Sequence, residues 1–173
     1  MIGSFDLEFL CDLAGNFSQI KGANMDQKTY YANAAKIFNF WRSAGFTNAV
    51  ACGLLAQADA ESSLNPDAVG DHDTAFGIDQ WHESRALAIK NGCGVDLRAT
   101  PKPSLSDQLK AALWELKHTE SAALHHIVAA NTAYDAGAAA CRFWERPGAP
   151  GQPDKRGKAA EKWAAYFAKN PVG

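Results

Sequence analysis

Glu61 is the residue of this 173-residue chain whose type and position point most directly to chemistry. It is the first acid of "AESSLNPDAVGDHDTAFGIDQWHESR" (residues 60–85) and follows an apolar, alanine-rich run. It comes three residues after Ala58 and seven after Leu54, so in a helix it shares their apolar face. The negative end of the helix dipole lies at the C-terminus of a helix and disfavours a further negative charge there. Partial burial has the same effect, so both favour the protonated form of the Glu61 carboxyl. Such a group can protonate the leaving oxygen of a glycosidic bond. If the side chain turns to solvent instead, Glu61 is only a polar helix end.

Two aspartates of the same stretch are candidates for a second catalytic carboxylate. An ordinary glycosidase places a second carboxylate across the sugar from its acid. Asp71 and Asp73 lie in a polar segment that could fold back towards Glu61, and Gly70 permits the turn. Asp67 is expected to cap a turn and Asp79 to point away from the site, because aspartates are common in turns for structural reasons.

These residues need a helical frame to position them, and the apolar periodicity supplies one. Thr47 is an expected N-cap, Gly45 a helix stop, and Ser104 with Asp107 a capping pair. The polar run after residue 63 reads as a long loop or a small β-hairpin, with "FGIDQWH" as a short strand or turn. "ERPGAPGQPDKRG" reads as a loop. The expected helices span residues 28–44, 48–63, 84–90, a segment that follows Ser104, a segment around 121–130, 132–144 and 158–169.

The predicted architecture is mainly α: a lysozyme-like helical domain over residues 28–173, preceded by an arm or linker over residues 1–27. The net charge of −2 excludes the basic footprint of a nucleic-acid-binding protein, so no nucleic acid is expected as a partner. No apolar run is long enough to insert into a membrane. The beginning of the chain does not resemble a secretory signal, and we expect synthesis in a cytoplasm.

The four cysteines are scattered and suggest neither a metal site nor another cofactor, and none is expected. Cys52 and Cys141 read as small buried residues. Cys11 and Cys93 either form a bridge or stay free, and cytosolic synthesis favours free thiols.

The stretch around Glu61 resembles the phage tail-tip lysozyme family, which belongs to the lysozyme-like superfamily. The shared pattern is a helix that ends in E-S-x-x-N-P, then G-D, then F-G-I-x-Q-W-H and an arginine. Upstream, "IFNFWRSAGFTNAVACGLLAQADAES" resembles the family's pair of helices. Downstream, "RFWERPGAPGQPDKRGKAAEKWAAYF" resembles its closing segment. The likeness runs from Tyr30 to Ala168, and its specificity comes from three separate blocks in the expected order.

The resemblance implies a peptidoglycan hydrolase (muramidase) that cleaves between N-acetylmuramic acid and N-acetylglucosamine, with Glu61 as general acid. Asp71, at the G-D position, is the first choice to activate water for inversion, and Asp73 the second. Ser62 would support Glu61 or the fold beside it, and Gln80 would hydrogen-bond a sugar N-acetyl group or a water.

Other residues of the resemblance have roles with open alternatives. Trp81 would offer a flat surface to a pyranose ring, and Phe76 would do so or pack in the core. His82 and Arg85 would bind muropeptide carboxylates or brace the loop. Tyr134, in "AYDAG", is similar to a transglycosylase tyrosine that touches the catalytic Glu, although an Asp replaces the Asn of that pattern. The Glu-Arg pair in "WERPG" reads as a helix-end ion pair in preference to a site residue.

Two other functions remain open at this stage. Glu61-Ser62 and Gly77-Ile78-Asp79-Gln80 also resemble lytic transglycosylases, which use one Glu and release an anhydro product. A non-catalytic peptidoglycan-binding or tail-structural module is the second alternative. The resemblance implies peptidoglycan glycan strands as the partner, with a phage tail or an endolysis machinery as the context. The protein would act on the bacterial cell wall from a phage particle, as a released endolysin, or as a secreted antibacterial effector.

Overall fold

The structure is a computed structural model that describes residues 25–172, and within them helices dominate. The prediction of an arm over residues 1–27 lies almost wholly outside the described part. So does Cys11, which would bridge to Cys93 in the alternative to free thiols. The elements are α2 (Gln27–Ser43), α3 (Asn48–Ser62), β1 (Val69–Gly70), β2 (Ala75–Phe76), β3 (Trp81–His82), α4 (Glu83–Cys93), α5 (Leu105–Lys117), α6 (Ser121–Val128), α7 (Ala133–Ala139), the π-helix η1 (Ala140–Glu145) and α8 (Gln152–Lys169).

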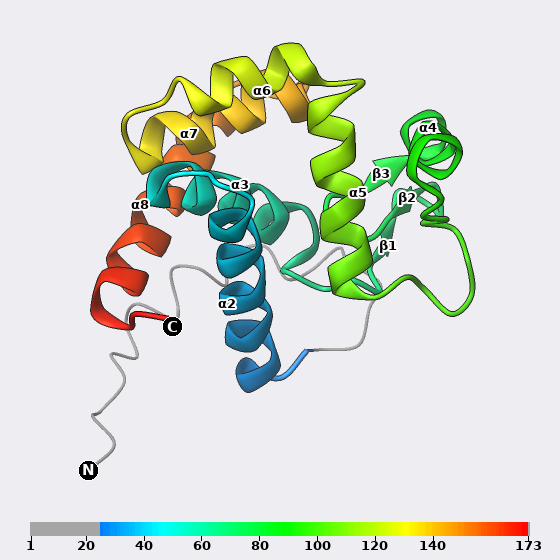
Figure 1. Ribbon diagram of the computed structural model, residues 1–173, viewed down its shortest axis with the longest axis horizontal. Helices are drawn as coiled ribbons and strands as arrows, with labels where there is room; N and C mark the ends of the chain where they lie inside the picture. Colours follow the sequence, from blue (N-terminus) through cyan, green and yellow to red (C-terminus); the bar gives the residue numbers. More distant parts are fainter. Residues whose placement is uncertain (1–24, 173) are drawn as a thin grey trace.

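Helix α5 separates two parts of the molecule (Figure 1). The small sheet and α4 lie on one side of it, and α2, α7 and α8 lie on the other. Helix α3 runs through the centre and packs most extensively against α7 and α8. The mainly α-helical architecture predicted from the sequence is confirmed, and the polar segment after α3 forms a small β-sheet.

The predicted caps account for several helix boundaries. The Thr47 side chain accepts a hydrogen bond from the backbone N–H of Val50, and the Ser104 hydroxyl accepts one from Asp107. Such side-chain acceptors satisfy backbone donors that a helix N-terminus leaves unpaired. Gly45 follows α2 with a φ of 94°, as the predicted helix stop requires.

The larger errors in the predicted helices lie near the end of the chain, although α4 also runs to Cys93, three residues past its predicted end at Lys90. Helix α8 begins at Gln152, six residues before the predicted start at Lys158. Pro153 in the first turn suits a helix N-terminus, because the ring fixes φ and the missing N–H would have been unpaired there. The predicted helix over residues 132–144 instead changes at Ala140 from α7 into η1.

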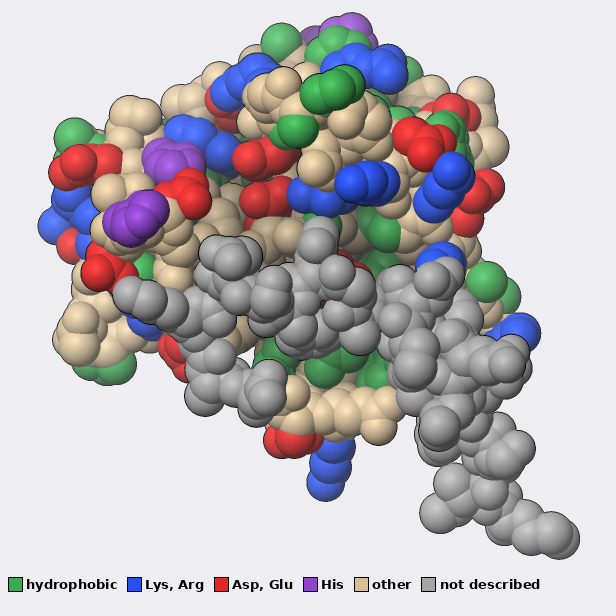
Figure 2. Space-filling model, turned by 180° about the vertical axis from the view of Figure 1, so that it is seen from behind, with side chains coloured by type: hydrophobic (Ala, Val, Ile, Leu, Met, Phe, Trp, Pro, Cys, Tyr) green, Lys and Arg blue, Asp and Glu red, His purple; other side chains and the backbone are tan. Residues whose placement is uncertain are grey.

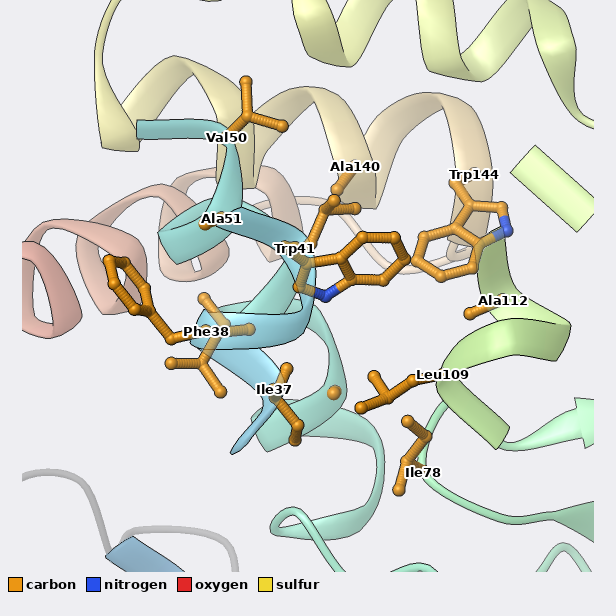
Figure 3. Packing of buried hydrophobic residues seen from close by; sticks show 14 of the residues in the cluster. Ile37, Phe38, Trp41, Val50, Ala51, Ile78, Leu109, Ala112, Ala140 and Trp144 are labelled. Atoms are coloured by element: carbon orange, nitrogen blue, oxygen red, sulfur yellow. The ribbon is translucent and has the colours of Figure 1, made fainter. Parts of the chain in front are cut away.

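The core surrounds α3, which is buried on nearly every side from Val50 to Ala58. Figure 3 shows Trp41 of α2 and Trp144 of η1 meeting above Leu109 of α5 and Ile78 of the hairpin region. All four side chains are almost completely buried. Residues from both sides of α5 therefore contribute to one continuous core.

Small residues let α3, α7 and α8 approach very closely. A Cβ added to Gly53 of α3 would lie 2.6 Å from the Cβ of Ala136 on α7. A Cβ on Gly137 of α7 would lie 2.6 Å from the backbone oxygen of Arg156 on α8. Close packing of this kind tolerates no added side-chain volume without a backbone shift. It also fixes where the first turn of α8 lies relative to the end of α3.

The three short strands form an antiparallel sheet in the order β1-β2-β3. Val69 pairs with Phe76, and Phe76 pairs with Trp81. Gln108 of α5 ties this region to the helices, because its side-chain oxygen accepts from the N–H of Ile78 and its amide donates to the carbonyl of Pro66. The sheet is thus held against α5 by hydrogen bonds to the backbone.

The face drawn in Figure 2 carries side chains of both charge signs, and acidic and basic side chains lie close to one another there. The large apolar side chains exposed within residues 25–172 are Leu87 and Val128. No helix in this range has the length and apolar character needed to cross a bilayer. Cys52 and Cys141 are buried free thiols as predicted, and Cys93 is also free.

The close approach of α7 and α8 predicts that Gly137→Ala destabilises the protein. The new methyl would press on the backbone of α8, and overpacking of this kind costs about 1–3 kcal/mol of unfolding free energy. Thermal or chemical denaturation measures the loss. Gly148→Ala is the matched control, since a Cβ there meets nothing within 4 Å. Equal stability of the two variants would contradict the tight contact.

Candidate active site

Glu61 lies in the last turn of α3, and two neighbouring side chains hold one of its carboxylate oxygens. Arg156 Nη2 lies 2.5 Å from Glu61 Oε1, and Gln57 Nε2 donates to the same oxygen over 3.1 Å. The Glu61 side chain is 15% exposed and that of Arg156 is 13% exposed. The described residues donate no hydrogen bond to Oε2. The carboxyl group is therefore fixed through one oxygen, and the other remains available.

Arg156 is a residue of the candidate site that the sequence does not single out. It lies in the six-residue extension of α8 that the sequence predicts as loop. Its Nε also donates to Gln57 Oε1 over 3.3 Å, so Gln57, Glu61 and Arg156 form a closed triangle. The signals that favour a helix here are Pro153 followed by Asp154 in the first turn, a common start of a helix.

A second buried carboxylate, Glu115 of α5, lies at the centre of the adjacent network. Its side chain accepts from Arg85 Nε and Nη2 at 2.7 and 2.8 Å, and from the indole N–H groups of Trp81 and Trp144 at 2.9 Å each. Its residue is 1% exposed. A buried carboxylate is tolerated only when donors and a positive charge compensate it. Glu115 thereby joins α5, β3, α4 and η1.

Glu115 could have been noticed in the sequence from its place on the helix. It comes three residues after Ala112 and four after Ala111, so it shares the helix face of these two apolar residues. An acid in that position is exceptional unless it is paired. Its partners come from distant parts of the chain, and no spacing in the sequence identifies them.

Asp79 and Glu145 add two further carboxyl groups to this region. Burial raises the pKa of Asp79 well above its usual range, and the charges of Glu115, Glu61 and Glu145 act in the same direction against that of Arg85. Its Oδ1 has no hydrogen-bond partner among the described residues. Asp79 therefore points into the protein, whereas the sequence suggested an aspartate directed away from the site.

Glu145 does not form the ion pair that the sequence suggests. Its neighbour Arg146 pairs with Glu120 at 2.8 Å instead. Glu145 Oε2 lies 3.8 Å from Arg85 Nη1. Burial, followed by the negative charge of Glu61, raises the pKa of Glu145 to about 7 against the opposing charges of Arg85, Arg156 and Arg146. Two carboxyl groups, Glu61 and Glu145, thus influence one another electrostatically in this region.

Asp71 and Asp73 lie together in the exposed turn between β1 and β2. Both have left-handed backbone conformations, with φ values of 48° and 70°. Asp71 Oδ2 lies 3.2 Å from His82 Nε2, and both side chains are more than half exposed. Gln80 is used within the sheet, where its amide donates to the carbonyl of Gly77 over 2.8 Å. The structure brings Asp71 and His82 together at the tip of the sheet.

Three other candidate residues are occupied by contacts within the fold. Trp81 is fully buried, so in this structure its ring offers no surface to a sugar. Ser62 is buried and donates to the carbonyl of Ala58. The Tyr134 hydroxyl donates to Asp154 over 2.8 Å, and the ring packs against Gly157. Tyr134 thereby contacts the first two turns of α8, which also carry Arg156.

Two comparisons with known proteins bear on this site. The model of a family described as phage tail lysozyme matches residues 32–167 of the chain. Morphogenesis protein 1 of Bacillus phage B103 is 28% identical over 155 residues, which cover 83% of this chain and 41% of that protein. The chain thus spans less than half the length of this relative.

Glu115→Gln is expected to destabilise the fold strongly. The amide leaves Arg85 without its counter-charge, and its own N–H groups would face the donors that now bind the carboxylate. Removing one partner of a buried ion pair lowers the free energy of unfolding by about 3–5 kcal/mol. Urea denaturation measures the change. Glu83→Gln serves as control, because the Glu83–Arg98 pair is exposed and such pairs contribute about 1 kcal/mol or less. Similar stabilities of the two variants would refute the central role of Glu115.

Proposed function

The chain belongs to the phage tail lysozyme family, and we propose that it is a muramidase that cleaves peptidoglycan between N-acetylmuramic acid and N-acetylglucosamine. In this proposal Glu61 is the general acid that protonates the glycosidic oxygen. Family membership supports a lytic enzyme that acts on peptidoglycan. The substrate bond and the role of Glu61 are our assignment.

The observation that carries the assignment is the way in which Glu61 is held. Arg156 and Gln57 both bind Oε1, so the side chain has one orientation. Oε2 receives no hydrogen bond from the described residues and can face the leaving oxygen of a bound glycan. General acid catalysis requires this combination of a fixed carboxyl group and an accessible oxygen.

Hydrolysis also requires a group that activates water. We assign this role to a loop aspartate, first Asp71 and then Asp73, which would make the reaction an inverting one. Residues 71–74 of their turn are exposed to solvent, where a glycan strand could reach them. Because Asp71 is already paired with His82, lytic transglycosylation is the second candidate. In that reaction Glu61 acts alone and the muramic acid 6-hydroxyl displaces the leaving group.

The phage particle is the context that the comparisons favour. The relative from phage B103 is named morphogenesis protein 1, and the description of the matching family is phage tail lysozyme. We therefore propose that the domain acts on the cell wall as part of a tail, in preference to a free endolysin or a secreted effector. Peptidoglycan glycan strands are its proposed ligand.

Glu61→Gln is expected to lower the rate of peptidoglycan clearing by about 10²–10⁴-fold, since the amide has no proton to give to the leaving oxygen. Turbidity of a suspension of purified cell walls measures the rate. Glu83→Gln, which replaces an exposed glutamate by the same amide, is expected to keep wild-type activity. Circular dichroism shows whether both variants are folded. Wild-type clearing by Glu61→Gln would refute the assignment of Glu61.

The loop aspartates are tested through the products and not only through the rate. We expect wild-type products that end in a reducing sugar, and we expect Asp71→Asn to lower their formation about 10²-fold, with a smaller effect of Asp73→Asn. Mass spectrometry distinguishes these products from the anhydro form, which is lighter by one water molecule. Anhydro products at wild-type rates from both variants would establish transglycosylation and exclude the aspartates.

A further inference from the structure

The guanidinium group of Arg156 has an edge that the contacts within the described residues do not use. Its Nε donates to Gln57 Oε1 over 3.3 Å, and its Nη2 lies 2.5 Å from Glu61 Oε1. Both contacts use the side of the guanidinium that Nε and Nη2 share. A guanidinium carries five N–H donors, so both donors of Nη1 and one of Nη2 remain. The described residues accept no hydrogen bond from Nη1.

The unused edge of Arg156 reaches solvent. Within the described residues, Asp79 Oδ1 is the buried side-chain polar atom that has no hydrogen-bond partner. Arg156 Nη1 and Glu61 Oε2 also lack a partner there and do not share this burial, so both atoms are accessible. The side chain of Arg156 is 13% exposed and that of Glu61 is 15% exposed. The two accessible atoms belong to groups in direct contact, so one ligand can meet both.

Arg85 offers no comparable edge to a ligand. Its Nε and Nη2 bind both oxygens of Glu115, and its Nη1 faces Glu145 Oε2 at 3.8 Å. A negatively charged ligand at this Nη1 would meet the Glu145 carboxyl, and like charges repel strongly where water is scarce. Among the described residues, Arg156 pairs with one acid, Glu61. Arg156 is therefore better placed than Arg85 to bind an anion.

An open guanidinium edge fits a carboxylate better than it fits a neutral sugar. Its coplanar N–H groups match the two oxygens of a carboxylate, and hydrogen bonds with a charge on each partner are the strong ones. Neutral polymers of N-acetylglucosamine carry no such group. In peptidoglycan, each N-acetylmuramic acid carries a lactyl group, which ends in a carboxylate or continues into a peptide stem with carboxylates of its own.

The position of this edge agrees with the proposed reaction. Muramic acid is the sugar whose anomeric carbon carries the bond to be cleaved, and its lactyl group is attached to the same ring. Arg156 Nη2 lies 2.5 Å from Glu61 Oε1, so a ligand oxygen bound to Nη2 would lie about 4–5 Å from Oε1. One muramyl unit can thus place its glycosidic oxygen at Glu61 Oε2 and its carboxylate at Arg156.

We propose that the open edge of Arg156 binds a carboxylate of the muramyl part of the substrate, and that this contact makes the enzyme prefer peptidoglycan to neutral N-acetylglucosamine polymers. The inference rests on the proposed function, in which the bond beside muramic acid is cleaved with Glu61 as the acid. Arg156 has two tasks in this arrangement. Its Nε and Nη2 side holds Glu61 through Oε1, and its Nη1 and Nη2 end holds the substrate.

Three ligands that share one disaccharide test the proposal by NMR titration. The first is N-acetylglucosaminyl-N-acetylmuramic acid with a free lactyl carboxylate, the second is its neutral lactyl methylamide, and the third carries the peptide stem. We expect the wild-type protein to bind at least one charged form about 10–100-fold more tightly than the amide. The charged form that binds more tightly identifies the lactyl group or the stem as the source of the carboxylate. Equal affinities for the three ligands, or no measurable binding, would overturn the proposal.

Substitutions of Arg156 test whether it causes the preference for a charged ligand. Arg156→Gln lacks the charge, so we expect it to bind the charged and amide forms equally. Arg156→Lys replaces a bidentate pair by a point charge, and we expect a reduced preference of about 3–10-fold. An undiminished preference in Arg156→Gln would rule out the assigned contact.

Arg42→Gln is the matched control for these variants. Arg42 donates to the carbonyl of Phe46, just before the start of α3. Glu61 lies in the last turn of the same helix, so the two arginines act at positions about 20 Å apart along α3. We expect Arg42→Gln to keep the wild-type preference for the charged ligand. A loss as large as that in Arg156→Gln would show that the preference does not come from the site, which also overturns the proposal.

The Nε–H signal of Arg156 gives a direct readout in the wild-type protein. We expect this signal to shift when the charged ligand is added and to move much less with the amide. The comparison holds even if Arg156→Gln does not fold, and equal shifts with both ligands would contradict the contact.

None of these measurements involves cleavage, so the two proposals can fail separately. Wild-type clearing by Glu61→Gln, together with a retained preference for the charged ligand, would refute the catalytic role of Glu61 alone. Loss of clearing in Glu61→Gln, together with equal binding of charged and amide ligands by the wild-type protein, would refute the role of Arg156 alone.

Discussion

A buried carboxylate that must be compensated organises the centre of this protein. Glu115 has almost no contact with solvent, and three side chains from outside its own helix supply four hydrogen bonds to it. Two of those donors belong to Arg85, which also provides the positive charge. Because an unpaired charge in the core is so costly, α4, β3 and η1 have few alternative positions around α5. The sheet and the C-terminal helices are thereby oriented relative to one another.

Glu61 and Glu145, at the edge of the core, are also poorly solvated carboxyl groups, but they are compensated less fully than Glu115. Glu61 is also largely buried and paired with an arginine, but two donors act on only one of its oxygens. Glu145 has an arginine nearby and no donor from the described residues. The acids thus form a series from fully compensated to barely compensated. The fully compensated member holds several elements together, and the others keep at least one carboxyl oxygen without a donor from the described residues.

Local patterns in the sequence predict much of the frame and less of the site. The apolar stripes of α2 and α5, the Thr47 and Ser104 caps and the stop at Gly45 all depend on neighbours within a few residues, and all are confirmed. Glu61 is singled out for the same reason, because its position on a helix face is a local property. Arg156, Glu115 and Glu145 depend on contacts between distant segments. The sequence does not predict the early start of α8, because the Gly and Pro residues before it are typical of loops. It does not predict the change from α7 to η1 either, because a π-helix has no clear sequence signature.

The contact between Glu61 and Arg156 joins residues that are 95 positions apart. A ribosome builds the chain from its N-terminus, so α3 emerges long before the first turn of α8. Until α8 has formed and packs against Gly137, Glu61 lacks its contact with Arg156 and is not shielded from water by α8. The site is therefore among the last features of the domain to form, and a chain released before α8 would contain the acid without its setting.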